Sequence, residues 1–368
     1  MSTPPDYWLC FSTSYAQSRT RFIAAAQSAN ARLAQYVHPY EKEPNGSSLS
    51  VDVAILGRID APRQLLALSG THGLEGPAGA AVQIAWLGSE QAKALPEDVA
   101  VILVHAINPY GWAYQTRTTE NNVDLNRNFV DHDLPYPPNP LYAELHSWLT
   151  PEEWSEASLK EQRQALDAFR EKYGADELFE TTARGQYTHP QGVIYGGSQR
   201  EWSNTVLETL ITEHMSHAHK VAFIDWHTGI GDFGQPFFLC FNDDGSEEQE
   251  QAAKWWGRET ILDQRPHGLA RPNYQGLVFQ GAQRFLAQAK LAGAVVEFGT
   301  RGINMRQALY LDQWLRFHAK RHPDAQRDEL LRADLLDAFV PLSSVWRRSA
   351  LEHGLRITRQ AIDGLAHW

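Results

Sequence analysis

The segment Ser69-Gly-Thr-His-Gly-Leu-Glu-Gly76 follows the apolar run Leu65-Leu-Ala-Leu68 and precedes a helix-like stretch that begins at Pro77. The apolar run predicts a buried strand, and the glycine-rich segment predicts a turn from that strand into a helix. An α/β sheet usually builds its ligand site at the carboxyl ends of its strands, where this turn would place His72 and Glu75. Since imidazole and carboxylate groups both bind zinc, the segment predicts two ligands of a catalytic zinc site.

The spacing alone is weak evidence, because His38-Pro-Tyr-Glu41 has the same pattern. This second pair lies beside two prolines and Asn45-Gly46 with no apolar run before it, which predicts a loop. For the first pair, the alternative to a metal site is a turn histidine next to a solvated acid.

The chain of 368 residues is long enough for one large α/β domain or two smaller ones. Its net charge is 33 minus 44, or −11, without a basic block, which argues against a nucleic-acid or anionic-membrane partner. No apolar run approaches the ~18 residues of a membrane span. The start, Met1 to Trp8, has neither a basic nor an apolar region of a signal peptide, and Cys10 and Cys240 suit a reducing compartment as core residues. We therefore expect a cytoplasmic protein.

Short apolar runs alternate with helical segments along the chain, which predicts an α/β fold with a mixed, mostly parallel sheet covered by helices on both faces. The expected strands are 51–56, 65–68, 99–107, 221–226, 237–241 and 294–298. The expected helices are 15–36, 77–94, 158–172, 199–215, 247–258 and 280–292, and Ser198-Gln-Arg-Glu201 has the pattern of a capping box.

Two stretches interrupt this alternation. Residues 131–190 are rich in Pro, Glu, Trp and Tyr and are interpreted as an insertion over the sheet edge. The tail from Asn304 onward is charged and helical, without a predicted strand. No internal repeat or low-complexity linker divides the chain, so 1–368 is interpreted as a single domain.

A third ligand is expected at the end of another strand. Val221-Ala-Phe-Ile-Asp-Trp-His227 is a buried strand that ends in a histidine and runs into Thr-Gly-Ile-Gly231. His227 could reach the same sheet edge as His72, or it could simply bond the backbone. Asp225, two residues earlier on the same strand face, is either an acceptor that orients His227 or a buried polar residue unrelated to metal. His105 is a rival third ligand, whereas the histidines of 213–219 are interpreted as a solvated patch.

The strand Ala294-Val-Val-Glu-Phe-Gly299 contains a carboxylate among apolar residues. Burial of Glu297 without a partner would cost several kcal/mol, so it needs a cation, a network of donors or a metal-bound water nearby. Beside a metal site such a glutamate can act as a general base, and its structural alternative is a salt bridge with a core arginine. Between the ligand motifs, the polar segment 108–129 supplies Arg117, Asn126 and Arg127 as donors for carboxylates or oxyanions, although a solvated loop is the default reading of any one of them.

This ordered set of motifs resembles the zinc carboxypeptidase (M14) superfamily, and in particular its DUF2817 branch, over residues 10 to about 320. The shared motifs are Ser69-Gly-Thr-His-Gly-Leu-Glu-Gly76, Val123-Asp-Leu-Asn-Arg-Asn-Phe129 and Val296-Glu-Phe-Gly-Thr300. The resemblance implies the zinc carboxypeptidase-like fold and one Zn²⁺ per chain.

The same resemblance implies a role for each matching residue. His72, Glu75 and His227 would bind zinc, Glu297 would be the general base, and Arg117 would stabilise the oxyanion. The substrate carboxylate would contact Asn126 and Arg127, and Tyr274 is a positional candidate for the substrate-binding tyrosine of the carboxypeptidases.

The expected function is zinc-dependent hydrolysis of an amide bond next to a free carboxylate, in a small peptide or in an N-acyl amino acid. The related aspartoacylase and succinylglutamate desuccinylase branch implies the N-acyl alternative. A catalytically silent carboxylate-binding protein and a purely structural domain are the rivals from other classes. The sequence does not fix the oligomeric state.

Overall fold

The computed structural model describes residues 6–302, 305–321 and 323–368. The first five residues of the amino-terminal stretch, and Asn304 where the helical tail was expected to begin, therefore lie outside the described residues. The strands are β1 (Arg32–Lys42), β2 (Ser48–Leu56), β3 (Arg63–Ser69), β4 (Val99–His105), β5 (Lys220–Gly229), β6 (Pro236–Leu239) and β7 (Lys290–Gly299).

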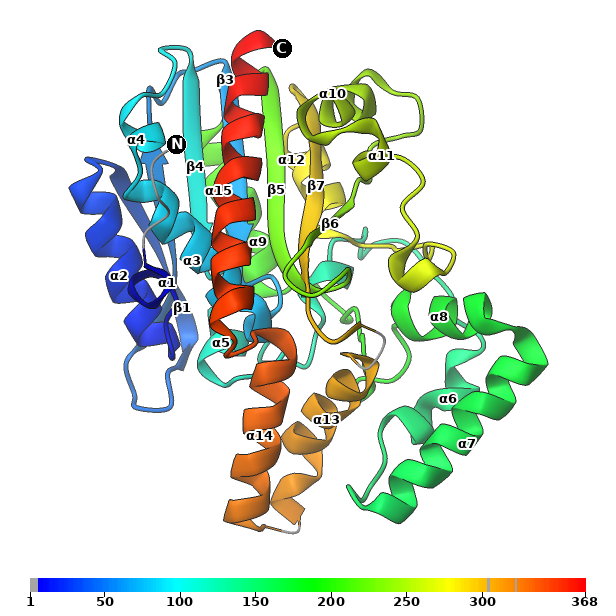
Figure 1. The fold of residues 1–368 in the computed structure, drawn as a ribbon. Coiled ribbons are helices and arrows are strands. Elements are labelled where there is room, and N and C mark those ends of the chain that lie inside the picture. The colour runs from blue at the N-terminus through cyan, green and yellow to red at the C-terminus, as the bar shows by residue number, and fades with distance from the viewer. Residues whose placement is uncertain (1–5, 303–304, 322) are drawn as a thin grey trace.

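The helices alternate with these strands and then dominate the carboxyl-terminal part (Figure 1). The α-helices are α1 (Tyr7–Cys10), α2 (Tyr15–Ser28), α3 (Gly76–Leu87), α4 (Glu90–Lys93), α5 (Pro109–Ala113), α6 (Tyr142–Leu149), α7 (Glu156–Tyr173), α8 (Ala175–Ala183), α9 (Trp202–His214), α10 (Glu247–Trp256), α11 (Arg258–Ile261), α12 (Val278–Phe285), α13 (Met305–Phe317), α14 (Ala325–Phe339) and α15 (Ser344–His367). Short 3₁₀ turns include η1 (Gly73–Glu75) and η2 (Leu125–Arg127).

The strands form one seven-stranded sheet in the order β1-β2-β4-β3-β5-β7-β6. The central pairings β4–β3, β3–β5 and β5–β7 are parallel, and the outer pairings β1–β2, β2–β4 and β7–β6 are antiparallel. The predicted α/β fold with a mixed sheet is thus confirmed. Its parallel centre brings the carboxyl ends of β3, β5 and β7 to the same edge.

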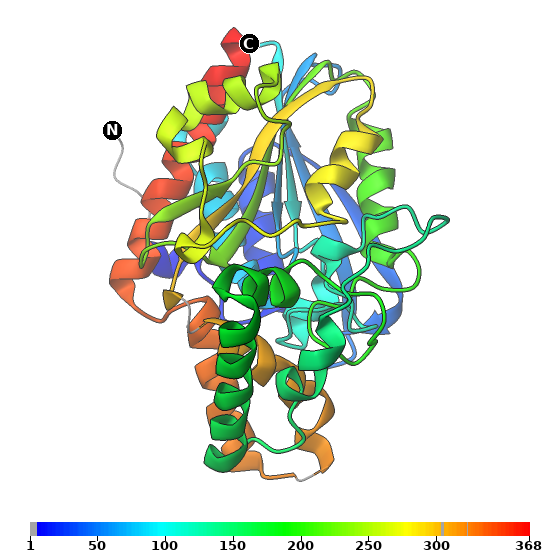
Figure 2. The ribbon, with the colours of Figure 1, turned by 90° about the vertical axis from the view of Figure 1, so that its right-hand side faces the viewer.

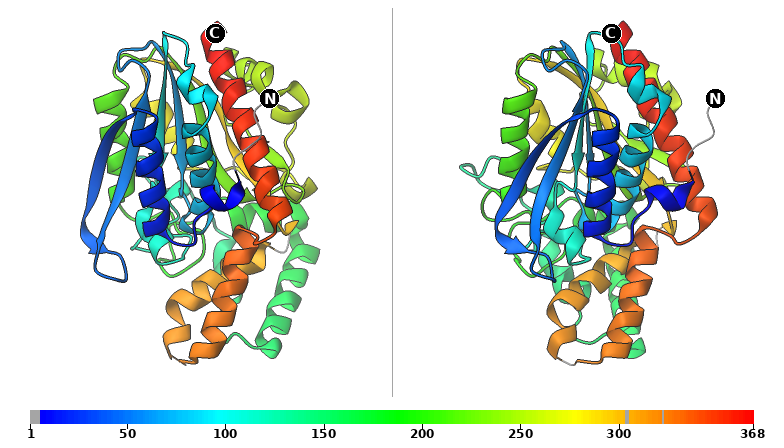
Figure 3. Two further views of the ribbon diagram at one scale, coloured as in Figure 1. Left: turned by 60° about the vertical axis from the view of Figure 1, so that its left-hand side comes forward. Right: turned by 90° about the vertical axis from the view of Figure 1, so that its left-hand side faces the viewer.

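Helices cover both faces of the sheet, as Figures 2 and 3 show. Alternate residues of β5 enter opposite cores: Ala222 and Ile224 face a core that includes α3, α10 and α15, and Val221 and Phe223 face a second core with α9 and α12. Because the central strands are buried on both sides, they appear in sequence as continuous apolar runs. This is why the central strands were predictable from the sequence.

The predicted helix 15–36 is wrong beyond Ser28. The chain leaves α2 through Asn30, whose φ of 55° is left-handed, and then forms the edge strand β1. Leu33 and Val37 point outward and are 36% and 49% exposed, so their apolar character imitated a helical face without marking a core. Strand β1 also contains His38 to Glu41, which was predicted as a loop; the β1–β2 register is irregular between Val37 and Lys42.

Other expected helix limits also differ from the structure. The predicted capping box does not form: helix α9 begins at Trp202, and the Glu201 carboxylate instead accepts a hydrogen bond of 2.8 Å from the Thr119 hydroxyl. The helix expected over 280–292 ends at Phe285, because Lys290 already pairs with Lys220 in the sheet. The helix expected over 77–94 is divided into α3 and α4, with Gly88 after the first.

Helices α6, α7 and α8 of the 131–190 segment and helices α13 and α14 of the carboxyl-terminal tail lie together beyond the carboxyl ends of the parallel strands, whereas α15 runs along the sheet (Figure 1). Tyr142, Phe169 and Leu178 from α6, α7 and α8 share an apolar cluster with Tyr310 of α13. The two segments, far apart in sequence, thus form the wall opposite the strand ends. In the described ranges, no helix is both long and apolar enough to cross a membrane.

Candidate metal and catalytic site

The turn after β3 brings His72 and Glu75 to the sheet edge. Gly70 has φ of 74°, a left-handed conformation that favours glycine, and it turns the chain out of the strand. A Cβ on Gly73 would lie 1.9 Å from the carbonyl carbon of Gly111, so η1 packs against α5 at a distance that only glycine allows. The close packing fixes the turn that carries both side chains.

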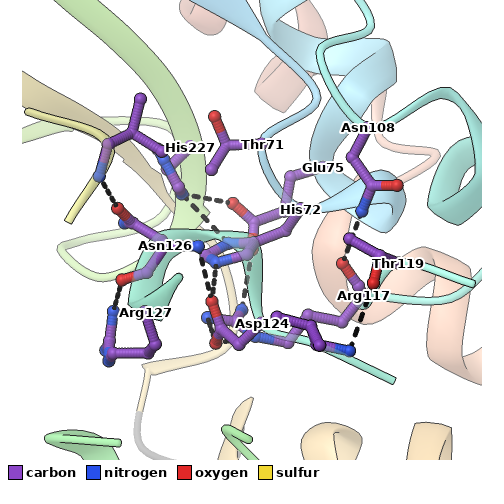
Figure 4. Close-up of polar contacts among 12 residues, drawn as sticks. Thr71, His72, Glu75, Asn108, Arg117, Thr119, Asp124, Asn126, Arg127 and His227 are labelled. Carbon is purple, nitrogen blue, oxygen red and sulfur yellow. Dashed lines mark hydrogen bonds and ion pairs between the residues drawn. The ribbon is translucent and has the colours of Figure 1, made fainter. Parts of the chain in front are cut away.

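Two adjacent parallel strands bring His227 and Glu297 to the same edge. The two residues are direct partners in the β5–β7 register. His72, Glu75 and His227 are 4%, 2% and 1% exposed, and their candidate ligand atoms lie within 4.8 Å of one another. The three predicted ligands, from two motifs 155 residues apart, thus converge on one point (Figure 4).

The distances among these ligand atoms fit a small divalent cation. His72 Nδ1 lies 3.1 Å from His227 Nδ1 and 2.9 Å from Glu75 Oε1, and His227 Nδ1 lies 3.0 Å from Glu75 Oε2. Atoms at the corners of a tetrahedron around zinc, with bonds of about 2.0 Å, are separated by about 3.3 Å. The two imidazole nitrogens and the Glu75 carboxylate therefore have about the spacing of one face of a tetrahedral zinc site.

Each histidine has a carboxylate on its other nitrogen. His72 Nε2 lies 3.2 Å from Asp124 Oδ1, and His227 Nε2 lies 2.8 Å from Asp225 Oδ2. The Thr71 hydroxyl lies 2.8 and 3.0 Å from the two carboxylate oxygens of Asp225 and donates to them. A hydrogen on each Nε2 satisfies these carboxylates and leaves both Nδ1 lone pairs directed at the same point. Two lone pairs so close repel unless a proton or a metal ion lies between them.

Asp124 and Thr71 were not given a role from the sequence. Asp124 belongs to the segment Asp124-Leu-Asn-Arg127, of which only Asn126 and Arg127 were predicted as site residues. The available signal was the rule that a metal-binding histidine needs an acceptor on its second nitrogen. Asp225 was the candidate acceptor for His227, and the same rule requires a second buried acceptor for His72.

We predict that Asp225→Asn lowers zinc affinity by about 10- to 100-fold, since an amide holds the His227 ring and its tautomer less firmly than a carboxylate does. Competition with a chromophoric chelator measures this affinity. The exposed Asp243 gives the matched control Asp243→Asn, which should bind zinc as the wild type does. Unchanged affinity in Asp225→Asn would show that Asp225 is only a buried polar residue.

Charges around the site favour a cation at the ligand atoms. Burial alone would raise the pKa of Glu75, but His72 and His227 outweigh it and hold this pKa well below its usual range. Likewise, burial would lower the pKa of His227, but Asp225 and Glu75 raise it well above its usual range. Positive charge is thus stabilised at this point of the structure.

Arg117 contacts one of the candidate ligands directly. Its Nη1 donates to Glu75 Oε1 at 3.1 Å, and its Nε donates to Asp124 Oδ2 at 3.1 Å. A backbone bond of 2.8 Å from its own N–H to Asp312 Oδ2 fixes the residue in place. The guanidinium therefore lies at the metal site, with remaining hydrogens able to meet a developing oxyanion.

Glu297 is buried at the same edge. Its Oε2 accepts a hydrogen bond of 3.3 Å from the Ile230 amide, and the side chain is 7% exposed. Burial and then the charge of Glu75 raise the pKa of Glu297 to about 7. A carboxyl group with a pKa near neutrality can both take and return a proton.

The segment after Arg117 provides two of the predicted substrate-binding residues, Asn126 and Arg127, and the loop before α12 provides Tyr274. Asn126 Oδ1 accepts a hydrogen bond of 2.9 Å from the Val278 amide, which leaves its amide nitrogen as the available donor. Arg127 donates through Nη1 to the Asn126 carbonyl and through Nη2 to the Ala183 carbonyl at 2.7 Å. The Tyr274 ring lies under the guanidinium, with 4.8 Å between the guanidinium carbon and the ring centre. Burial raises the pKa of Tyr274 to about 12, so its phenol is a neutral donor.

All eight predicted site residues line one cavity of about 130 Å³. They are His72, Glu75, Arg117, Asn126, Arg127, His227, Tyr274 and Glu297. Most of the other lining residues are apolar, and they include Phe179 and Ala183 of α8, Leu309 of α13 and Phe339 of α14. Helices α8, α13 and α14 thus close the site from the side opposite the strands.

The rival histidines lie elsewhere. His105 stacks on Phe22 with 4.8 Å between ring centres, its Nε2 is 2.9 Å from the Ser18 hydroxyl, and burial lowers its pKa to about 3. His38 Nε2 is 3.1 Å from Glu120, outside the cavity. Over the described ranges, the only group of three His, Cys, Asp or Glu residues spaced for a metal ion is His72, Glu75 and His227.

Comparison with known families identifies the chain. The model of the family described as "Protein of unknown function (DUF2817)" matches residues 11–353, so the chain belongs to this family. The predicted resemblance to DUF2817 is confirmed. No curated protein matches the chain.

Solved structures show more distant similarity. A metallo-carboxypeptidase from Burkholderia cenocepacia is 13% identical, with 94% of this chain and 68% of that chain covered and a TM-score of 0.43. The succinylglutamate desuccinylase from Chromobacterium violaceum is 15% identical, with 88% and 74% covered and a TM-score of 0.35. A glutaminyl cyclase from Fimbriiglobus ruber is 10% identical, with 97% of each chain covered and a TM-score of 0.44.

Proposed function

We propose that this protein is a zinc-dependent hydrolase that cleaves an amide bond next to a free carboxylate. The observation that supports it most strongly is the triangle of His72 Nδ1, His227 Nδ1 and Glu75, with sides of 2.9 to 3.1 Å, beside the buried Glu297. When bound by these three residues, zinc would supply Lewis acidity toward a carbonyl and lower the pKa of a water.

The protein residues would supply the remaining chemistry. Glu297 would take a proton from the attacking water and deliver it to the leaving nitrogen. Arg117 would donate to the oxygen that gains negative charge, and its contact with Asp124 would hold the fork in position. Asn126 and Arg127 would hold the substrate carboxylate and so place the amide bond next to it at the reacting groups.

The cavity favours a small substrate. The cavity volume of about 130 Å³ accommodates on the order of ten water molecules. A dipeptide or an N-acyl amino acid fits such a space better than an extended polypeptide does. A screen of peptides with free carboxyl termini against N-acyl amino acids, with zinc present, distinguishes peptidase from deacylase; absence of all hydrolysis would favour the silent binding protein.

Amidation of the substrate carboxylate should lower kcat/KM by a factor that corresponds to about 2–5 kcal/mol, because it leaves the buried Arg127 poorly paired. Arg127→Lys should not restore activity, since one ammonium group cannot reproduce the planar fork. The measurement compares kcat/KM for the free and amidated forms of the best substrate. Equal values would show that the enzyme does not recognise a terminal carboxylate, and would contradict both readings of the substrate.

A further inference from the structure

The cavity wall contains an arginine that the proposed mechanism does not use. Arg306, in α13, lines the cavity with the eight candidate residues. Its Nε and Nη2 are buried and have no hydrogen-bond partner among the residues that the structure describes. The guanidinium carbon lies 4.5 Å from the centre of the Phe179 ring, which supports the flat face of the group but accepts no conventional hydrogen bond.

This arrangement is unfavourable without a ligand. An arginine stays protonated in proteins, so burial of its donors without acceptors costs free energy. Burial lowers the pKa of Arg306, and the phenols of Tyr310 and Tyr274 only partly oppose that effect. Among the described lining residues, the carboxylates are Glu75 and Glu297, both at the strand ends. The wall near Arg306 therefore has open donors and no anion of its own.

Helix α8 contacts both this group and Arg127. Phe179 contacts Arg306, and the carbonyl of Ala183 accepts from Arg127 at 2.7 Å. Phe179 and Ala183 are four residues apart, which is about 6 Å along the helix axis. Arg127 Nε is also buried without a partner among the described residues. Two guanidinium groups with open donors thus line the same cavity and contact groups of α8 that are about one helical turn apart.

We propose that Arg127 and Arg306 form two anion subsites, and that the preferred substrate has an aspartate or glutamate as its carboxylate-bearing residue. Arg127 receives the α-carboxylate and Arg306 receives the side-chain carboxylate. The two carboxylates of one acidic residue are separated by a few bonds, which suits guanidinium groups that contact α8 about one helical turn apart. The apolar remainder of the wall excludes water and strengthens both contacts. This inference rests on the proposed function.

Kinetics test the preference. Wild type should cleave substrates that end in glutamate about 10- to 100-fold more efficiently than the same substrates ending in glutamine, the factor expected for a charge-assisted hydrogen bond. Arg306→Gln should remove this preference mainly through KM, and Arg306→Lys should keep part of it. Lys320→Gln, an exposed cation in the same tail, is the control and should behave as the wild type. Equal kcat/KM for the two substrates in the wild type overturns the inference and needs no variant.

A binding measurement separates this inference from the proposed function. Calorimetry with glutarate and with its monoamide requires no hydrolysis. Wild type should bind glutarate about 10-fold or more tightly than the monoamide, and Arg306→Gln should bind both equally. If no substrate is hydrolysed but glutarate is preferred, the proposed function fails and the two-anion site stands. If substrates are hydrolysed and the two ligands bind equally, the hydrolase stands and the two-anion site fails.

Discussion

Glu297→Gln should lower kcat by about 100- to 10,000-fold, the range that a general base contributes. The amide fills nearly the same volume and can keep the bond from the Ile230 N–H, but it cannot take a proton. Zinc content and thermal stability should stay near those of the wild type, which separates lost chemistry from lost structure. The matched control is Glu259→Gln at an exposed carboxylate.

Residual activity within about tenfold of the wild type, or ~1.4 kcal/mol, would assign the base to another group. Glu75 is not available for that role in our account, because it is a ligand. Loss of zinc in Glu297→Gln would instead place Glu297 in the metal-binding set. The two results are distinguishable because zinc and turnover are measured on the same sample.

The second large effect is expected at the metal. His227→Ala should abolish stoichiometric zinc binding and all measurable hydrolysis, since it removes one of three ligands and leaves Asp225 without its imidazole partner. Elemental analysis of purified protein should give one zinc per chain for the wild type and close to none for the variant. His219→Ala, at an exposed histidine, should keep the metal.

A thermal measurement supports this test. Zinc that binds only the folded chain should raise the melting temperature of the wild type and not that of His227→Ala. Full zinc content in His227→Ala would remove His227 from the site. His105 would then be the remaining strand-end histidine, although it stacks on Phe22 and does not line the cavity.

The central strands and the residues at their ends were predictable because burial on both faces leaves uninterrupted apolar runs. A polar residue at the end of such a run, as with His227, or within one, as with Glu297, stands out in sequence. The parallel centre of the sheet then brings these positions together. The order of the strands therefore largely explains why the predicted ligands and the predicted base lie close together.

The errors have a common physical origin in local signals that tertiary contacts overrode. Strand β1 pairs with β2 at the sheet edge, so Leu33 and Val37 could point outward without a cost large enough to exclude them. Glu201 binds Thr119 from another segment, and this contact replaced the predicted capping box. Arg306 was not predicted as a site residue for the same reason. Its place in the cavity wall depends on the packing of α8 against α13.

The most direct test of the account is hydrolysis of a panel of small carboxylate-bearing amides by wild-type protein before zinc removal, after chelation and after zinc is restored. We predict that the wild type cleaves at least one amide next to a free carboxylate, that chelation abolishes this activity, and that one equivalent of zinc per chain restores it. If the protein binds one zinc at His72, Glu75 and His227 and still cleaves none of these amides, or if cleavage continues without metal, the account is contradicted.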